Sequence, residues 1–251
     1  MSKPEQKVLI TGATSGVGLS LVRHLQSQYH VVALGRSGDK LKTLFGNDDR
    51  VDCYVANFER TDSVSAILDN VLTEHPIVLN VINNAGAMLN ASITTLNATD
   101  LQSLLSVNTI AAHVVMKKCL PAMLTSNFGR IINVTSGAAF NCFPNFAAYS
   151  ASKAALNALT LTASAEHCDS NIKINLMSPG PVRSQMAPDA PLDPSVCHPT
   201  VDYLLSADES LPTGGFFWLG HKLATSPDFS GIDWLAGTAP PRIPYVLDDK
   251  D

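Results

Sequence analysis

The chain has 251 residues, of which 45% are hydrophobic and 16% charged, and its formal net charge is −5 at neutral pH. A chain of this length and composition can bury a hydrophobic core without disulfides and lacks the compositional bias of a disordered protein. The acidic balance argues against nucleic-acid binding, which needs a basic face, and we expect no nucleic-acid partner.

Cysteine and histidine usage gives no sign of a metal site. The five cysteines are scattered without a C-x-x-C pair, and the histidines stand apart from one another, so we expect no metal ion. The N-terminal MSKPEQKVLITG lacks the apolar region of a signal peptide, and no run of about 18 apolar residues occurs. The sequence therefore predicts a cytoplasmic protein with no membrane segment.

Short β-branched runs alternate with longer helical patterns over most of the chain. The expected strands are Val8–Thr11, Val31–Leu34, Val51–Val55, Val78–Asn83, Arg130–Val134 and Ile172–Met177. The expected helices are Val17–Gln28, Asp62–Glu74, Asp100–Ser126 and Ala147–His167. Near-continuous apolar strands separated by helices are typical of a parallel sheet covered on both faces. The pattern predicts the α/β class: a doubly wound, Rossmann-type sheet of about seven strands in one domain, residues 1–251.

The composition changes after Met186, where APDAPLDPSVCHPT contains four prolines. Such a stretch is typical of irregular structure, and we expect residues 187–212 to form a substrate loop or lid. A short helix near Thr200–Ala207 and a strand near Gly215–Leu219 are expected to complete the fold, with residues 240–251 as a surface tail.

The first expected strand runs into a glycine-rich turn, TGATSGVG, and then into a helix. Glycines at such a junction allow a tight turn and let the backbone approach a pyrophosphate, which the helix N-terminus attracts. The alternative is a turn that merely ends the strand. The junction indicates a dinucleotide phosphate site built from Gly12, Thr14, Ser15, Gly16, Val17 and Gly18.

The end of the second expected strand, Gly35-Arg36-Ser37, indicates which dinucleotide is used. NAD-binding proteins of this kind place an acidic residue about 20 residues past the glycine loop to hold the ribose 2′-hydroxyl. Gly35 occupies that position here, and the guanidinium of Arg36 suits a 2′-phosphate, to which Ser37 can add a hydroxyl. The sequence predicts NADP(H) as cofactor, the alternative being an exposed arginine without a ligand.

Tyr149 and Lys153 are four residues apart in a helical pattern and so share one helix face. A free tyrosine has a pKa of about 10, and a neighbouring ammonium is expected to lower it toward the pH at which acid–base catalysis works. Ser136 follows the fifth expected strand, and open α/β sheets place their chemistry at strand ends. These three residues are the candidate catalytic group.

The ordered set of motifs resembles the short-chain dehydrogenase/reductase family, in its short single-domain branch. Asn83-Asn84-Ala85-Gly86 is similar to a second family signature, and Pro179 to Ser184 is similar to its Pro-Gly-x-Val-x-Thr, with serine replacing threonine. Asn57 stands where the family usually has aspartate near the adenine. The resemblance implies further cofactor contacts from Asn57, Asn84, Ala85, Gly86, Tyr149, Lys153, Pro179, Gly180, Val182 and Ser184.

The resemblance also implies catalytic roles. Ser136 would hydrogen-bond the substrate oxygen, Tyr149 would deliver or remove its proton, and Lys153 would tune Tyr149 and hold the nicotinamide ribose. Asn108 would support a water in the proton relay, its alternative being a polar residue at a local kink. The implied activity is that of an NADP(H)-dependent ketoreductase acting on a small carbonyl or alcohol substrate.

A non-catalytic NADP(H)-binding sensor or scaffold of the same fold is the alternative function. The pocket is expected to be lined by Gly137, Ala138, Phe143, Met186 and residues 188–199, which suit an uncharged or partly apolar ketone. The resemblance implies a homo-oligomer, a dimer or a tetramer. The ending Thr213-Gly214-Gly215-Phe216 departs from the family's Val-Asp-Gly-Gly strand, which places the tetramer in doubt.

Overall fold

A mainly parallel sheet lies at the centre of the computed structural model, which describes residues 6–225. Its eight strands run in the order β3-β2-β1-β4-β5-β6-β7-β8, and only β8 pairs antiparallel with its neighbour. The strands are β1 (Lys7–Thr11), β2 (His30–Gly35), β3 (Val51–Val55), β4 (Asn80–Asn83), β5 (Gly129–Val134), β6 (Ile172–Ser178), β7 (Phe216–Trp218) and β8 (His221–Leu223). The predicted doubly wound sheet is confirmed, with β8 as an additional strand.

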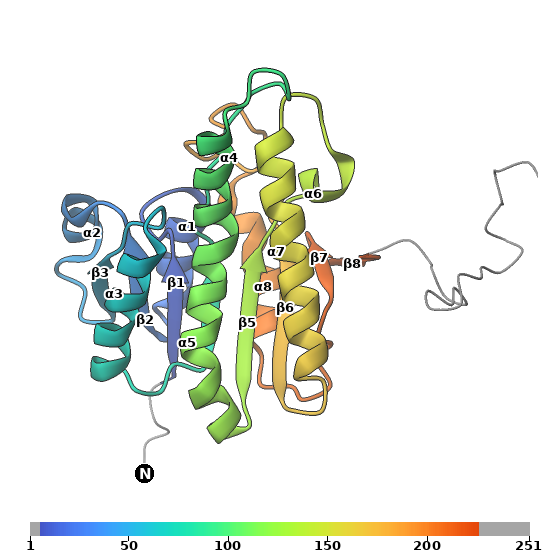
Figure 1. The fold of residues 1–251 in the computed structure, drawn as a ribbon. Coiled ribbons are helices and arrows are strands. Elements are labelled where there is room, and N and C mark those ends of the chain that lie inside the picture. Colours follow the sequence, from blue (N-terminus) through green and yellow to red (C-terminus); the bar gives the residue numbers. More distant parts are fainter. Residues whose placement is uncertain (1–5, 226–251) are drawn as a thin grey trace, which may run out of the picture.

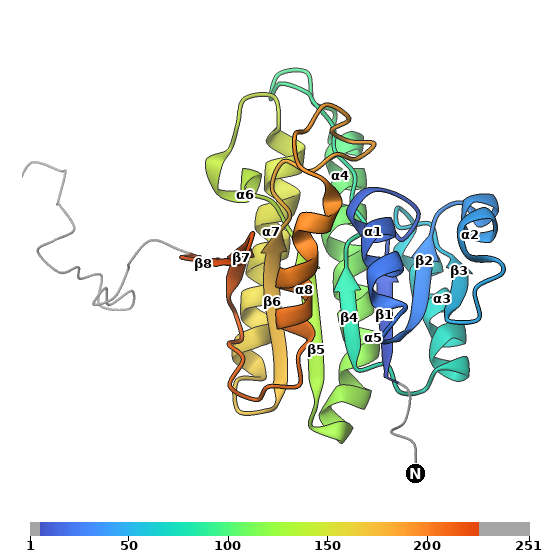
Figure 2. The same ribbon diagram turned by 180° about the vertical axis from the view of Figure 1, so that it is seen from behind.

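Helices cover both faces of this sheet (Figures 1 and 2). They are α1 (Gly16–Leu25), α2 (Gly38–Phe45), α3 (Thr61–Glu74), α4 (Ala98–Leu105), α5 (Ala111–Ser126), α6 (Ala138–Asn141), α7 (Ala147–Glu166) and α8 (His198–Leu205). Figure 1 shows α3, α5 and α7 on one face, and Figure 2 shows α1 and α8 on the other. The fold therefore has three layers.

The alternation of side chains along the strands divides the hydrophobic core in two. Val8 and Ile10 of β1 pack with α1, α2 and α8, whereas Leu9 between them packs with α3 and α5. Successive side chains of a strand point to opposite faces, so a sheet covered on both sides needs apolar residues at nearly every position. This explains why the strand sequences are almost continuously hydrophobic.

The helix predicted over Asp100–Ser126 is interrupted. It starts at Ala98 as α4, passes through a π-helical turn at Ser106–Ile110 and continues as α5. Single π-helical turns within α-helices often mark functional sites. Asn108 lies in this turn, and its side chain is buried.

The proline-rich segment contains more regular structure than its composition indicates. A 3-10 turn over Pro194–Cys197 leads directly into α8, which begins at His198, before the predicted Thr200. Proline is favoured in the first turn of a helix because its missing N–H would have no partner there. Residues 240–251 lie outside the described residues. Between residues 6 and 225, no helix has the length and apolar character to cross a membrane.

The strand order indicates where a ligand would bind. β1 pairs with β2 on one side and with β4 on the other, so the chain order reverses between β1 and β4. In open α/β sheets, ligands bind at such a reversal, beyond the carboxyl ends of the strands. The loops after β1, β2, β4, β5 and β6 meet at that edge.

Candidate active site

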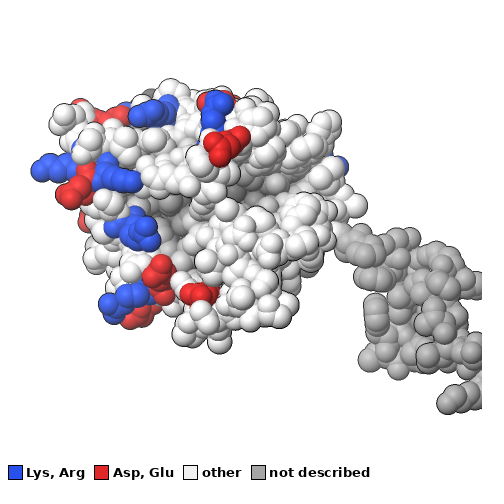
Figure 3. Space-filling view, turned by 90° about the horizontal axis from the view of Figure 1, so that it is seen from above, with Lys and Arg blue, Asp and Glu red and all other residues white. Residues whose placement is uncertain are grey.

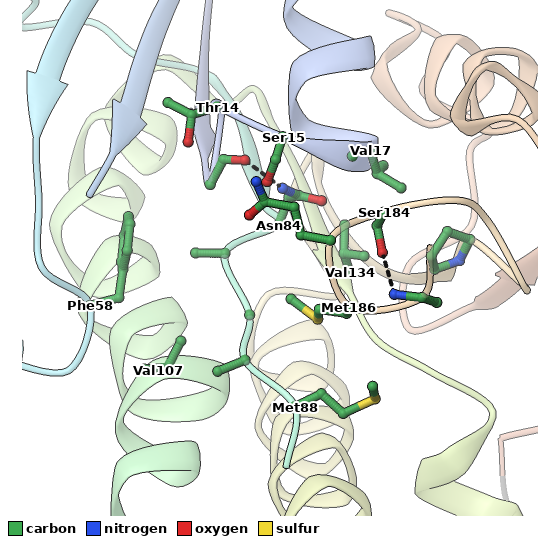
Figure 4. Close-up of a pocket in the computed structure, with 18 of the residues that line it drawn as sticks. Thr14, Ser15, Val17, Phe58, Asn84, Met88, Val107, Val134, Ser184 and Met186 are labelled. Carbon is green, nitrogen blue, oxygen red and sulfur yellow. Dashed lines mark hydrogen bonds between the residues drawn. The ribbon is translucent and has the colours of Figure 1, made fainter. Parts of the chain in front are cut away.

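A cavity of about 570 Å³ opens at the carboxyl ends of the strands (Figure 4). It is lined by the glycine loop, the end of β2, the segment after β4, Tyr149 and Lys153 of α7, and the loop after β6. Most predicted cofactor contacts line it: Gly12, Thr14, Ser15, Gly16, Val17, Arg36, Ser37, Asn57, Asn84, Ala85, Gly86, Tyr149, Lys153, Pro179, Gly180, Val182 and Ser184.

Hydrogen bonds join the glycine loop to the segment after β4. Thr11 Oγ1 accepts hydrogen bonds from the backbone N–H groups of Asn84 and Ala85, each at 3.0 Å. The Asn84 side chain in turn donates to the carbonyl oxygens of Thr11 and Gly12, at 3.0 and 3.2 Å. The two sequence signatures are therefore one structural unit, and Asn84 shapes the loop.

Gly12 and Gly16 are required by this geometry. Both have positive φ, +69° and +51°, which side chains rarely adopt. A Cβ on Gly12 would lie 2.8 Å from the Cα of Ala85, and one on Gly16 would lie 3.0 Å from the Cβ of Ser184. No side chain therefore covers the backbone N–H groups at the start of α1, and the Ser15 side chain makes no capping hydrogen bond to them. Free N–H groups at a helix start suit the pyrophosphate of a dinucleotide.

Two cations lie at the end of β2. Arg36 lines the cavity as predicted, and so does Lys40, from the first turn of α2. Ser37 caps α2, accepting a hydrogen bond from the backbone N–H of Lys40 at 3.3 Å. Sequence reasoning missed Lys40 because α2 was not predicted. A capping serine at position 37 followed by Leu41 and Leu44 at helical spacing is the signal that could have revealed it.

Close packing leaves little room for a side chain at Gly35. A Cβ on Gly35 would lie 2.8 Å from Cγ2 of Thr14 and 3.3 Å from the Leu41 side chain. The residue therefore brings the glycine loop against the end of β2. An aspartate, which would favour the free ribose of NAD, has no room here unless Thr14 moves.

Lys153 of α7 is buried beside the cavity, whereas Tyr149, one turn before it, is half-buried. Lys153 is 4% exposed, and its Nζ donates a hydrogen bond to the carbonyl oxygen of Val134 at 2.8 Å. Burial lowers the pKa of Lys153 from its ordinary value of 10.5 to about 8. The Lys153 Nζ lies 5.9 Å from the centroid of the Tyr149 ring. The two side chains share one helix face, as their spacing predicts.

The pKa of Tyr149 differs from the expectation. Burial raises it above its ordinary value, and a hydrogen bond with Ser136 opposes that rise only in part. The expectation that the lysine lowers it was wrong for this arrangement, because the phenol is desolvated while the ammonium donates to Val134. A phenol with a raised pKa is protonated at neutral pH and can act as a proton donor.

Asn108 organises the region beside this pair. Its Oδ1 accepts from the backbone N–H of Ala87 at 2.7 Å, and its Nδ2 donates to the Ala87 carbonyl oxygen and to Ser152 Oγ, both at 2.9 Å. A Cβ on Gly86 would lie 3.3 Å from Asn108 Oδ1 and 3.6 Å from Lys153 Nζ. The amide thus holds the segment after β4 against α7. Its part in a water-mediated proton relay stays a prediction.

The expected substrate wall is only partly in the cavity. Met186 lines it, joined by Met88, which was not predicted. Phe143 is 52% exposed, and Arg183 forms an ion pair with Asp193 at 3.5 Å. In the described part of the chain, no group of three or more His, Cys, Asp or Glu side chains could hold a metal ion.

Comparisons with known proteins agree with this geometry. The family model described as "short chain dehydrogenase" matches residues 6–194. "Uncharacterized oxidoreductase YbbO" of Escherichia coli strain K12 is 32% identical over 184 residues, 72% of this chain and 67% of that protein. "3-oxoacyl-[acyl-carrier-protein] reductase FabG" of Rickettsia bellii is 31% identical over 184 residues, 72% and 74% of the two chains. The crystal structure of a metagenomic short-chain oxidoreductase in complex with NADP has a TM-score of 0.75, with 26% identity over 85% of this chain and 96% of that one.

Proposed function

This chain belongs to the short-chain dehydrogenase/reductase family, and from that premise we propose that it is an NADP(H)-dependent reductase that converts a ketone or an aldehyde into an alcohol. One observation carries the proposal: Tyr149, in hydrogen-bond contact with Ser136, and Lys153 lie in the wall of the same cavity as the glycine loop. A binding protein without catalysis has no need of a half-buried, protonated phenol at that place.

The positive side chains beside the end of β2 support NADP(H) as the cofactor. A 2′-phosphate would meet Arg36, Lys40 and the start of α2, where two positive side chains reinforce the positive end of the helix dipole. The glycine loop fits the pyrophosphate, and the segment from Pro179 to Ser184 would hold the nicotinamide end. The NADP in the related metagenomic oxidoreductase supports the same choice.

The protein's own groups would perform the proton chemistry. NADPH bound in this cavity would supply the hydride that the carbonyl carbon receives. The Tyr149 hydroxyl donates a proton to the carbonyl oxygen, while the Ser136 hydroxyl donates a hydrogen bond to the same oxygen and orients it. The Lys153 ammonium stabilises the phenolate that Tyr149 then carries, until solvent returns the proton. Hydride plus proton converts C=O into CH–OH.

The raised pKa of Tyr149 favours the reductive direction. Reduction needs a proton donor at the start of the cycle, and the half-buried neutral phenol of Tyr149 is one. Alcohol oxidation would need the phenolate, which burial disfavours.

We also infer a homodimer formed through the outer faces of α5 and its neighbour α7. Ile110, directly before α5, Leu124 of α5 and Leu159 of α7 expose 42%, 49% and 36% of their surface. Exposed apolar side chains along neighbouring helices are typical of a surface that a second subunit covers.

The proposed activity is tested by following NADPH consumption in the presence of a panel of ketones and aldehydes. Wild-type protein is expected to consume NADPH only when a carbonyl compound is added, and to form the matching alcohol. If NADPH binds but no carbonyl compound is reduced, the sensor or scaffold function replaces the reductase.

A further inference from the structure

The open end of the cavity has walls almost free of charge. It is bounded by the loops that follow β4, β5 and β6. The sequence contains no Asp, Glu, Lys or Arg over residues 76–99 or over residues 131–152, which include the first two loops. Viewed from above, charged side chains gather on the side of α2 and β3, whereas the side of α6 is largely uncharged (Figure 3).

The loop after β6 also provides few positive charges that could bind an anion. Arg183 is its one cation in the described stretch 179–193, and Asp193 already faces it at 3.5 Å. Lys153, deeper in the site, is 4% exposed and donates to Val134. A carboxylate or phosphate on the substrate would therefore lose its hydration without gaining a free cation.

Apolar side chains occupy the same loops. Met88 and Met186 line the cavity and are 37% and 44% exposed; Figure 4 shows both on the side away from Thr14 and the glycine loop. The loops after β4 and β5 carry three further exposed apolar side chains, Ile93, Phe140 and Phe143, of which Phe140 packs edge-on against Phe216. Exposed apolar groups in the wall of a cavity, as Met88 and Met186 are, favour an apolar ligand.

This surface is continuous with the catalytic tyrosine. The loops after β4 and β5 are joined by a hydrogen bond from the backbone N–H of Ala91 to the carbonyl oxygen of Asn145, at 2.8 Å. The next residue, Phe146, packs edge-on against Tyr149, with ring centroids 6.3 Å apart. A substrate whose carbonyl reaches Tyr149 thus leaves its remaining part among apolar side chains.

We propose that the substrate is an uncharged carbonyl compound with an apolar substituent, held between Met88 and Met186, and that anionic oxo acids are selected against. This inference rests on the proposed reductase function. Burying apolar area contributes about 25 cal/mol per Å², and the flexible, polarizable methionine side chains adapt to substituents of different shape.

The test uses two compounds that differ in one charge, methyl benzoylformate and benzoylformate. Titration calorimetry measures the binding of each to the protein–NADP⁺ complex, where the ketone cannot be reduced, and NADPH consumption measures turnover separately. The ester is expected to bind at least about tenfold more tightly than the acid, a difference of about 1.4 kcal/mol.

Two lysine substitutions test whether the preference for the ester arises at the cavity wall around Met186. Met186→Lys places a cation in the cavity wall and is expected to reduce the difference between ester and acid. Ile77→Lys adds the same charge in the exposed loop before β4, at the opposite end of the sheet, and is expected to leave the difference unchanged.

The outcomes separate the two proposals. Equal or tighter binding of the acid, or no binding of either compound, overturns the inference about substrate class. A difference that Met186→Lys does not alter contradicts the role of the methionine wall. An ester that binds preferentially but is not reduced, together with an inactive carbonyl panel, contradicts the reductase function and leaves the binding preference established.

Discussion

Lys153 and Tyr149 share a helix face, yet the Lys153 Nζ directs its hydrogen bond to the Val134 carbonyl oxygen, 2.8 Å away, and lies 5.9 Å from the Tyr149 ring centroid. The ammonium is held by the end of β5, so its distance from the phenol is fixed by the sheet. In the proposed reduction, Tyr149 would be neutral until it gives up its proton, and the Lys153 ammonium would stabilise the negative charge that this leaves on the phenolate.

The pH dependence of carbonyl reduction follows from this arrangement. The pKa of Lys153 is about 8, and that of Tyr149 is raised, so the ammonium is the first of the two groups to lose its proton as pH rises. We expect kcat/KM for reduction to be constant below pH 8 and to fall by up to about tenfold per pH unit above it. A pH profile of NADPH consumption checks this.

Lys153→Arg is the matched variant, because a guanidinium stays protonated across this range. Any activity that it retains should lack the decline near pH 8. A wild-type rate that rises between pH 8 and pH 10 would contradict the assignment.

Cofactor selection is expected to depend on both cations beside β2. Arg36→Ala and Lys40→Ala should each weaken NADPH binding by about tenfold, since each removes a charge facing the 2′-phosphate, and leave NADH binding nearly unchanged. Fluorescence titration measures both affinities. Lys42→Ala, on the same helix but not in the cavity lining, is the control. Equal losses for NADPH and NADH would refute the 2′-phosphate assignment.

Gly12→Ala should lower stability and weaken cofactor binding. The new Cβ would lie 2.8 Å from the Ala85 Cα in a residue with φ +69°, a combination expected to cost about 1–3 kcal/mol in the free energy of unfolding. Gly220→Ala separates strain from crowding, because Gly220 has φ +81° but nothing within 4 Å of its added Cβ. Chemical denaturation should show the smaller loss for Gly220→Ala, with unchanged NADPH binding; similar effects of both variants would show that crowding against Ala85 is unimportant.

Asn108→Leu removes three hydrogen bonds from a side chain that is 1% exposed. The N–H of the half-buried Ala87 and the buried Ser152 would each lose a partner, and we expect a loss of about 1–3 kcal/mol in unfolding free energy. Because Ala87 borders the cofactor cavity, NADPH affinity should fall as well. A variant as stable as wild type would show that these bonds are replaced by water.

Sequence periodicity was enough to predict the parallel sheet, since strands buried on both faces must be apolar almost throughout. It did not predict the π-helical turn at Asn108, because a turn of i to i+5 bonds hardly changes the apolar pattern of the helix. The antiparallel β8 was missed because its three residues are all exposed and carry no burial pattern.

The candidate site was predictable where a residue type follows a strand end, as for Arg36, or where two residues share a helix face, as for Tyr149 and Lys153. Lys40 was missed because its position depends on the unpredicted α2. The direction of the Tyr149 pKa shift depends on burial and on the acceptor of the Lys153 hydrogen bond. Neither can be predicted from the spacing of the two residues in the sequence.

The central claim is that Tyr149 donates the proton in an NADPH-dependent carbonyl reduction, and the comparison of wild type with Tyr149→Phe tests it most directly. Both proteins should bind NADPH with similar affinity in a fluorescence titration, because the substitution removes only the hydroxyl. With the best substrate of the carbonyl panel, alcohol formation by Tyr149→Phe should be slower by at least about 100-fold. A variant that retains the wild-type rate would contradict the account.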